Sequence, residues 1–364
     1  MAFIPNFTIT PTLATALSAI ELLKENVKGL PITATVLHSL YESARLQSVH
    51  YSTQIEGNRL TQPEVEQVLK ERATVVGRQR DESEIKGYYQ ALEWMEQNVG
   101  RELTETTVKT LHALVEGGGK KRVKPTPYRD GQNVIRNSAD GAMVYLPPEA
   151  PDVPALMTDL VEWIKTAALP CPLIAALTHY QFATIHPYYD GNGRTARLLT
   201  TLVLHQGGYG LKGLFSLEEY YARDLPAYYR ALNVHPHHNY YFGRATADTT
   251  AWAEYFIAGM ADAFAKVKER ATAAIGAKDQ TRKLRSLPPK QRKILSRFAR
   301  QDVLTAKEVE KIFKFGERSA RLLCQTLVEQ GFLTIASEAN KTRAYKLAAR
   351  YRKLLEGKIP HSES

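Results

Sequence analysis

The sequence lacks the features that mark secreted and membrane proteins. Only two of its 364 residues are cysteines, Cys171 and Cys324, and they lie far apart without the spacing of a metal site. No apolar run approaches the roughly 20 residues that a transmembrane helix needs. Residues 1–7 lack the basic start and the small-residue cleavage site of a signal peptide. We therefore expect a cytoplasmic protein with reduced thiols and no membrane association.

The chain also lacks internal repeats and low-complexity segments, and its charge is unevenly placed. The net charge is +10, whereas residues 279–358 alone contain 20 Lys and Arg against 8 Asp and Glu, a net of +12. The rest of the chain is therefore slightly acidic, at −2 in sum. A chain of this length with 44% hydrophobic residues can bury a full core and is expected to hold two or three domains.

The most informative segment is residues 186–197, His-Pro-Tyr-Tyr-Asp-Gly-Asn-Gly-Arg-Thr-Ala-Arg. Because Gly191 and Gly193 have no Cβ, backbone N–H groups there can approach an anion closely. The apolar residues that follow repeat at helical spacing, so the turn presents its amides at a helix N-terminus, where the helix dipole favours negative charge. Arg194 and Arg197 are three residues apart and can face the same phosphate chain. The segment suits chemistry on a polyphosphate.

This segment resembles the signature of the Fic family, H-P-F-x-[D/E]-G-N-G-R-x-x-R. Tyr188 replaces the usual Phe, which keeps the ring, and we expect it to keep a packing role. The resemblance implies an enzyme that transfers AMP from ATP to a Ser, Thr or Tyr hydroxyl of a target protein, and of itself. The residues alone also allow a structural His-Pro turn followed by an ordinary basic helix.

The resemblance implies a role for each motif residue. His186 would be the general base, which suits an imidazole with a pKa near neutrality. Asp190 would hold the Mg²⁺ that bridges the phosphates. The implied nucleotide-binding residues are Gly191, Asn192, Gly193, Arg194, Thr195, Ala196 and Arg197. The first three would form an anion hole, and the two arginines would neutralise the outer phosphates.

A second segment, from Ser52 to Gly57, resembles the inhibitory pattern [S/T]-x-x-x-E-[G/N] of the same family. Ser52 and Glu56 are four residues apart and lie on one face of a helix predicted to begin at 33 and to stop near Gly57. The resemblance implies that Glu56 pairs with Arg197 and occupies the position of the γ-phosphate, so that ATP binds unproductively. The alternative is a glutamate that ends a helix without a partner.

Two further features resemble parts of the family. Residues 132–137 and 142–146 flank an Asp-Gly turn and predict a β-hairpin. Fic enzymes use such a flap to pair with the backbone of the target, so an unknown target protein is expected to dock on residues 132–146. A plain surface hairpin is the alternative. Tyr229 is predicted to place a ring near the nucleotide, although paired tyrosines at helical spacing often serve packing.

The expected fold is mainly α, a Fic-type helical bundle with a β-hairpin flap, followed by a winged-helix domain of the α+β class. The predicted domains are an N-terminal helical region with the inhibitory motif (1–110), a Fic catalytic core (111–275), a polar linker (276–287) and a winged helix-turn-helix domain (288–358).

The basic C-terminal domain suggests contact with the DNA backbone. The expected contributors are Arg318, Arg321, Lys341 and Arg343. Winged helices also dock proteins or dimerise, so both uses stay open. Residues 235–238, His-Pro-His-His, have a spacing that could bind a transition metal, but a solvated loop is the preferred interpretation.

Rival functions remain at this point. The same scaffold could transfer another nucleotide or remove AMP, or the chain could be a DNA-binding regulator whose Fic domain senses nucleotide. The target protein, the modified residue and the signal that relieves inhibition stay open. The oligomeric state also stays open, and a homodimer is one of the alternatives.

Overall fold

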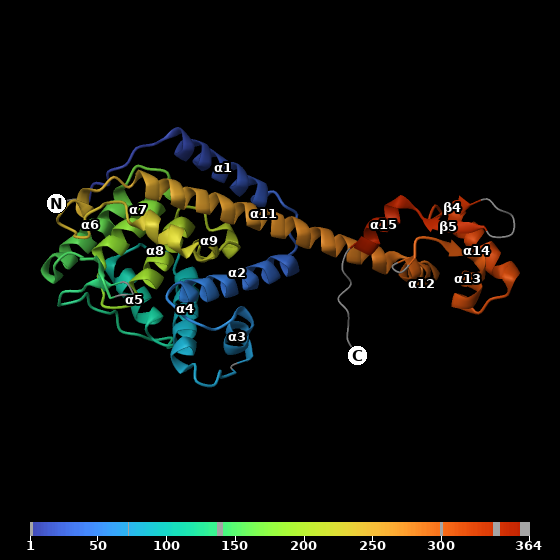
Figure 1. Ribbon diagram of the computed structural model, residues 1–364, viewed down its shortest axis with the longest axis horizontal. Coiled ribbons are helices and arrows are strands. Elements are labelled where there is room, and N and C mark those ends of the chain that lie inside the picture. Colours follow the sequence, from blue (N-terminus) through green and yellow to red (C-terminus); the bar gives the residue numbers. More distant parts are fainter. Residues whose placement is uncertain (1–2, 72, 137–140, 299–300, 338–342, 357–364) are drawn as a thin grey trace. The chain divides into compact units, whose positions relative to one another are not determined.

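The computed structural model describes residues 3–71, 73–136, 141–298, 301–337 and 343–356 (Figure 1). The chain divides into two compact units, Met1–Ala271 and Thr272–Ser364. In the described residues, no helix is both long and apolar enough to cross a membrane. Most of the described chain is helical, which confirms the predicted mainly α class.

The first unit consists of helices and one short hairpin. Its helices are α1 (Pro11–Lys28), α2 (Ala34–Ile55), α3 (Gln62–Glu66), a π-helix (Gln67–Glu71), α4 (Gln79–Gln97), α5 (Glu105–Val115), α6 (Val153–Thr166), α7 (Cys171–Ile185), α8 (Asn192–Gln206), α9 (Glu218–Arg223), α10 (Leu225–Leu232) and the part of α11 (Thr250–Ser286) up to Ala271. Short 3₁₀ turns at Ala150–Asp152, Leu211–Gly213 and Arg244–Thr246 connect them.

Helices α7 and α8 form the centre of this unit. Most of their residues are buried, as expected for helices that are covered on all sides. His179 of α7 is fully buried and links three helices, because its ring nitrogens lie 3.1 Å from Oγ1 of Thr200 in α8 and 2.9 Å from the hydroxyl of Tyr228 in α10. The motif loop connects the end of α7 to the start of α8, so a rigid pair of helices holds both of its ends.

Helix α2 carries the segment predicted to be inhibitory, Ser52 to Gly57. Thr33 caps its N-terminus, and the helix ends at Ile55, so that Ser52 is helical and Glu56 is the C-cap, directly before the predicted stop at Gly57. Gly57 then adopts a φ of +91°, which stops the helix. The C-terminus of α2 is therefore fixed, with Glu56 at the cap position and Gly57 directly after it.

The predicted hairpin forms strands β1 (Ile135–Arg136) and β2 (Met143–Tyr145), which pair antiparallel. Residues 137–140 of the predicted turn lie outside the described residues. The histidine-rich loop contacts this hairpin: the Leu146 N–H donates to the His238 carbonyl (2.7 Å), and the Tyr240 N–H donates to the Leu146 carbonyl (3.1 Å). That loop therefore closes the base of the flap.

The second unit combines helices and a small sheet. Its elements are α12 (Pro289–Phe298), β3 (Leu304–Thr305), α13 (Ala306–Phe313), α14 (Glu317–Glu329), β4 (Leu333–Ser337), β5 (Ala344–Leu347) and α15 (Ala349–Glu356). The sheet is antiparallel with the order β3-β5-β4. Its own core contains Ile294, Val309 and Phe332, each 0% exposed.

The segment predicted as a polar linker, 276–287, is helical through Ser286, because α11 extends from Thr250 to that residue. Its alanines, lysines and arginines are good helix formers, and the chain has no proline there until 288. Lys341, a predicted DNA contact, lies outside the described residues.

Candidate active site

His186 ends α7 in the left-handed conformation, with φ 52° and ψ 62°. For a residue with a side chain this conformation costs roughly 1–2 kcal/mol, so neighbouring contacts must hold it. The His186 N–H donates to the Phe182 carbonyl (3.0 Å), and its own carbonyl accepts from Nε of Arg129 (3.0 Å). The backbone of the predicted base is therefore fixed on both sides.

The His186 side chain is half-buried, and its burial lowers its pKa to about 4. The charge of Arg129 acts in the same direction, while a backbone hydrogen bond at Ala183 and the carboxylates of Glu56 and Asp190 oppose it. The imidazole is therefore neutral near pH 7, the form that can accept a proton.

Asn192 shapes the loop between His186 and α8. Its Oδ1 accepts from the Tyr188 N–H (3.0 Å), and its Nδ2 donates to the Tyr188 carbonyl (2.8 Å). The residue is buried, and both ends of its amide are engaged. The side chain of Asn192 therefore holds the turn, and its contribution to the predicted anion hole is limited to its backbone N–H.

His112 of α5 supports the same loop, and the sequence analysis missed it. Its ring stacks on Tyr188 with centroids 3.6 Å apart, and its Nε2 lies 2.9 Å from the Asp190 carbonyl. Burial lowers the pKa of His112 to about 4, so the neutral ring donates this hydrogen bond. Tyr188 is 2% exposed and packs as expected for the aromatic position of the motif.

The start of α8 presents backbone donors to the site. Gly191 has a φ of +71°, and its N–H donates to Oδ1 of Asp190 (2.7 Å). None of the described residues accepts from the N–H groups of Asn192, Gly193 and Arg194. A Cβ added to Gly193 would lie 2.1 Å from Oε1 of Glu56, so glycine is required for a carboxylate to approach this backbone. An anion already lies over the helix N-terminus.

That anion is held by the second motif arginine. Nη2 of Arg197 donates to Oε1 of Glu56 (2.8 Å) and to the carbonyl of Ser52 (2.8 Å), and its Nε donates to Oγ of Ser52 (2.8 Å). Burial lowers the pKa of the 2%-exposed Arg197, but the Glu56 carboxylate outweighs this effect and raises it. The structure therefore brings together Ser52, Glu56 and Arg197.

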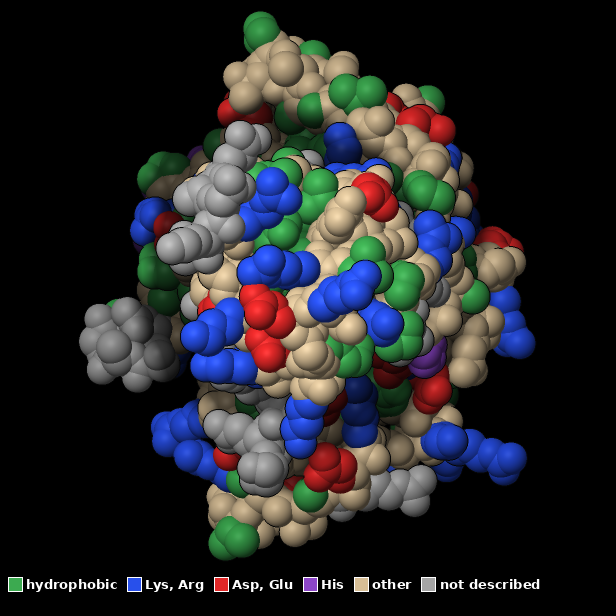
Figure 2. Space-filling view, turned by 90° about the vertical axis from the view of Figure 1, so that its right-hand side faces the viewer, with side chains coloured by type: hydrophobic (Ala, Val, Ile, Leu, Met, Phe, Trp, Pro, Cys, Tyr) green, Lys and Arg blue, Asp and Glu red, His purple; other side chains and the backbone are tan. Residues whose placement is uncertain are grey.

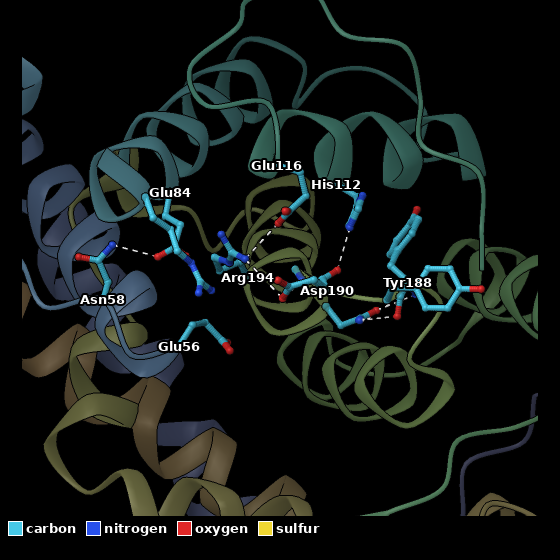
Figure 3. A network of polar contacts seen from close by, with 12 residues as sticks. Glu56, Asn58, Glu84, His112, Glu116, Tyr188, Asp190 and Arg194 are labelled. Atoms are coloured by element: carbon cyan, nitrogen blue, oxygen red, sulfur yellow. Dashed lines mark hydrogen bonds and ion pairs between the residues drawn. The ribbon is translucent and has the colours of Figure 1, made fainter. Parts of the chain in front are cut away.

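Arg194 contacts different carboxylates. Its Nη2 lies 3.0 Å from Oε1 of Glu116, at the end of α5, and 3.7 Å from Oδ1 of Asp190 (Figure 3). Burial raises the pKa of Glu116, and Arg194 counteracts this. Together with Arg80 and Glu84, these side chains line a hollow of about 390 Å³. Each motif arginine thus has its own carboxylate partner.

Three other predicted site residues occupy different surroundings. Thr195 and Ala196 are 0% exposed and face the core, so their side chains do not line the hollow. The N–H of Thr195 already donates to the Gly191 carbonyl (3.0 Å). The Tyr229 ring is 48% exposed, and its hydroxyl lies 3.5 Å from the carbonyl of Ile55, the residue before Glu56.

Asn58 fixes the predicted inhibitory segment, Ser52 to Gly57, onto α4. Its Nδ2 donates to the Asp81 carbonyl (2.9 Å) and to Oε2 of Glu84 (3.0 Å), a contact drawn in Figure 3. Its own N–H donates to the Thr53 carbonyl of α2 (3.1 Å). The position of Glu56 is therefore set by the end of α2 and by α4 together.

Comparison with known proteins identifies this region. Residues 102–204 match the model of the Fic/DOC family. The protein adenylyltransferase Fic of Drosophila willistoni is 32% identical over 182 residues, which cover 48% of this chain and 35% of that protein. The Drosophila virilis protein of the same name is 32% identical over 181 residues, 48% of this chain and 36% of that protein. The chain thus spans about a third of the length of these curated relatives.

Solved structures show the same fold. A Fic family protein from Desulfovibrio desulfuricans superposes with a TM-score of 0.60 and 23% identity, covering 95% of this chain and 99% of that one. A Fic domain containing signaling protein from Bacteroides thetaiotaomicron gives a TM-score of 0.59 and 24% identity, covering 72% and 97%. Residues 102–204 therefore match the Fic/DOC family, and they lie in a fold that these solved Fic proteins share.

Proposed function

We propose that this chain transfers AMP from ATP to a Ser, Thr or Tyr hydroxyl of a target protein, and of itself, and that Glu56 restrains the reaction. The observation that supports this most is the Glu56 carboxylate, bound to Arg197 and lying against Gly193 at the start of α8. A carboxylate at a helix N-terminus and beside an arginine occupies a position where a phosphate would also bind. The relatives named protein adenylyltransferase support the same reaction.

In the proposed reaction one bond to phosphorus forms, one breaks, and one proton is transferred. The target hydroxyl oxygen forms a bond to the α-phosphorus of ATP, and the bond from that phosphorus to the bridging oxygen breaks. Pyrophosphate leaves with the electron pair, and the hydroxyl proton moves to the imidazole of His186, which is neutral because burial lowers its pKa to about 4. The N–H groups of α8 and the two arginines would stabilise the negative charge of the phosphates.

Asp190 fits the predicted Mg²⁺. Its carboxylate is 71% exposed beside Arg194, and its Oδ1 accepts from the Gly191 N–H. Mg²⁺ prefers one or two carboxylates together with phosphate oxygens and water. When bound, the ion would screen the charge of the phosphates, and Asp190 would hold it.

Labelled nucleotides test the proposal. The wild type, Glu56→Gly and Glu56→Gly/His186→Ala are each incubated with ATP labelled on the α- or the γ-phosphate. Removing the glutamate frees Arg197 and should raise α-label incorporation roughly tenfold to a hundredfold, the range of one charge-assisted hydrogen bond. Adding His186→Ala should reduce it by about 10²–10⁴ while ATP still binds.

A control variant and other labelled nucleotides distinguish AMP transfer from the rival activities. Glu66→Gly removes an exposed glutamate from the end of α3, far from the motif in sequence, and should leave labelling at the wild-type level. Incorporation of the γ-label would show phosphoryl transfer instead. Labelled GTP, CTP and UTP test nucleotide choice, and release of AMP from the labelled protein tests removal. Equal labelling of wild type and Glu56→Gly would contradict the inhibitory role.

The flap supports a target site. Met143 and Val144 of β2 are 49% and 40% exposed, which leaves apolar side chains on a short strand. An extended target segment can pair with such a strand and place its hydroxyl near His186. We therefore include docking on residues 132–146 in the proposal, and the double change Met143→Ser/Val144→Ser should weaken labelling of a target more than self-labelling within one chain.

A second candidate function for residues 272–364 is binding to DNA through a winged helix-turn-helix. Helices α12 to α14 followed by β4 and β5 have the expected order. Arg318 and Arg321 on α14, and Arg343 before β5, are exposed. Figure 2 shows Lys and Arg side chains spread over the face turned to the viewer, with fewer Asp and Glu among them. Solvated cations of this kind suit phosphate contacts.

Salt dependence tests this second function. If the three arginines each neutralise a phosphate, raising salt from about 50 to about 200 mM should weaken duplex binding roughly 40-fold. The triple change Arg318→Gln/Arg321→Gln/Arg343→Gln should remove most of this dependence. No mobility shift of a duplex at low salt would exclude the function and favour protein docking.

A further inference from the structure

We propose that Arg129 is a positioning residue: it fixes the backbone of His186 and links it to the end of the flap. The inference rests on the proposed function, because it gives the consequence for AMP transfer. Arg129 lies in the segment between α5 and β1, outside every motif found in the sequence. Its role comes from its contacts.

Arg129 is 4% exposed and donates hydrogen bonds to three carbonyls. Nε donates to His186 (3.0 Å), Nη1 to Gly131 (3.0 Å) and Nη2 to Pro148, which follows β2. The Arg129 N–H donates to the Pro187 carbonyl (2.9 Å). One residue thus contacts two consecutive positions of the motif loop and the chain that leaves the flap.

The absence of a carboxylate partner makes these contacts informative. Within the described residues, no Asp or Glu forms an ion pair with Arg129. Burying a cation without a counter-charge is unfavourable, so packing alone would be better served by an apolar side chain. A guanidinium, however, presents several donors in a rigid fork, which matches three carbonyls at fixed positions. The feature that selects arginine here is the placement of those carbonyls.

Of the three carbonyls, that of His186 depends most on a hydrogen-bond donor, because the backbone of His186 is in an unfavourable conformation. His186 is one of few residues with a side chain and a positive φ in the described chain, and it is the C-cap of α7. Without a donor, the peptide after His186 could rotate toward an ordinary helical or extended conformation, which would move the imidazole. Arg129 opposes this rotation directly.

The neighbours of Arg129 extend the contact along the loop. The Tyr189 hydroxyl donates to Oδ1 of Asp130 (2.8 Å), and Nδ2 of Asn133 donates to the Tyr188 carbonyl (3.2 Å). Residues 129–133 therefore follow the motif loop and then enter β1. Because the same guanidinium also holds Pro148, a displacement of the flap is transmitted to the backbone of His186.

The charge of Arg129 affects the pKa of His186, a quantity that a change in packing alone would leave unchanged. The charged groups that face His186 are Arg129, which lowers its pKa, and Glu56 and Asp190, which raise it. Removing the Arg129 charge therefore raises the pKa of His186. The acidic limb of kcat/KM, which reports the free enzyme, then moves to higher pH.

The test uses the full chain carrying Glu56→Gly, with Arg129→Gln or Arg129→Lys added. Arg129→Gln should lower kcat for AMP transfer roughly tenfold or more, the scale of a misplaced catalytic group, with KM for ATP within about twofold. It should also move the acidic limb up by about one pH unit. Arg129→Lys keeps the charge and one donor group, so it should leave the acidic limb in place and recover part of kcat.

Arg244→Gln is the matched control. Arg244 is also buried, at 8% exposure, and it also donates to uncharged oxygens, those of Leu232 and Asn233, but it has no contact with the motif loop. It should lower the melting temperature to a similar degree without moving the acidic limb. If Arg129→Gln behaves like Arg244→Gln in both kcat per folded molecule and pH profile, Arg129 is only structural and the proposal is overturned.

Two further measurements separate failure of this inference from failure of the proposed function. If the Glu56→Gly parent transfers no AMP, the function fails before Arg129 is changed. An NMR titration of the His186 ring still tests the positioning: its pKa must rise in Arg129→Gln, and an unchanged value rejects the inference. If Arg129→Gln does not fold, Arg129→Lys decides, because a kcat equal to that of the parent would contradict the need for the fork.

Discussion

The two units of the chain place their charges in opposite ways. In residues 1–271 the arginines of the site are buried: Arg129, Arg194 and Arg197 are 4%, 3% and 2% exposed, and each is held by defined oxygen atoms. In the described part of residues 272–364 no charged side chain is buried, although this unit holds the positive excess of the chain.

This difference separates two uses of charge. A buried charge acts strongly over a short distance, because little water screens it, and it can hold one oxygen in one place. A solvated charge is screened within about 10 Å at 0.1 M salt, so it attracts a polyanion without fixing its position. Group transfer needs the first kind and non-specific binding needs the second. The predictions below test whether the units respond separately.

The largest expected difference is the response to acid. Five histidines of the first unit have a pKa lowered by burial: His50, His179 (to about 3), and His112, His186 and His205 (each to about 4). Their unfolded-state pKa is near 6.5, so as the pH falls below 6.5 the unfolded chain binds protons that the folded unit does not. Stability of the first unit should therefore fall between pH 6.5 and 4, by on the order of several kcal/mol in all.

Tryptophan fluorescence can follow this effect in the full chain. All three tryptophans, Trp94, Trp163 and Trp252, belong to the first unit. The second unit has no histidine among its described residues, and a calorimetric transition of its own should depend much less on pH in this range. His205→Gln should reduce the slope of the fluorescence melting temperature against pH. A melting temperature that stays constant from pH 7 to 4.5 would contradict the depressed pKa values.

The next difference concerns one arginine in each unit. Arg197→Met leaves Glu56 and Ser52 without their donor inside the site and should lower the free energy of unfolding by about 3 kcal/mol, the scale of a broken buried pair. Arg321→Met removes an ion pair with Glu317 whose side chains are 65% and 68% exposed, and should change stability by less than about 0.5 kcal/mol.

Urea unfolding followed by tryptophan fluorescence and by circular dichroism measures both variants. Arg197→Met should also abolish transfer in the Glu56→Gly background, whereas Arg321→Met should not affect it. Comparable stability losses for the two substitutions would show that burial does not distinguish the units, and the comparison would fail.

Sequence reasoning located the parts of the site whose signal is local. Residues 186–197 are contiguous, and the helical periodicity after Arg197 places the loop before α8. Ser52 and Glu56 are linked by the spacing of one helix turn, and the structure brings both to Arg197. Both signals can be recognised in the sequence because each lies within one short contiguous segment of the chain.

The supporting residues could not be found in this way. Arg129 and His186 are 57 residues apart, and His112 and Asp190 are 78 apart, and in both pairs the partner is a backbone carbonyl. A carbonyl is present at every residue, so no side-chain pattern marks the contact. Glu116 pairs with Arg194 only because α5 packs on α8.

A smaller effect is expected from a helix cap in the second unit. Thr305 caps α13, and its hydroxyl and N–H exchange hydrogen bonds with Glu308 in a capping box. Thr305→Ala should destabilise the second unit by about 1 kcal/mol. The tryptophan transition should stay unchanged, while the calorimetric transition of the second unit moves down. A shift of both transitions by the same amount would mean that the units unfold as one.

The smallest effect is expected from removing most of the second unit. A chain ending at residue 281 keeps every contact of the site, since the residues that touch His186, Arg194 and Arg197 all precede Ala271. In the Glu56→Gly background, self-labelling by this chain should differ from that of the full chain by less than about twofold, because none of the buried charges that act on the phosphates is lost. The tryptophan melting temperature should also be retained. If labelling falls while that melting temperature is unchanged, the solvated charges of the second unit must contribute to transfer, either by steering the target or by carrying the modified hydroxyl. Mapping the AMP-bearing residue on the full chain would then distinguish these two cases, since only the second places the label beyond residue 281.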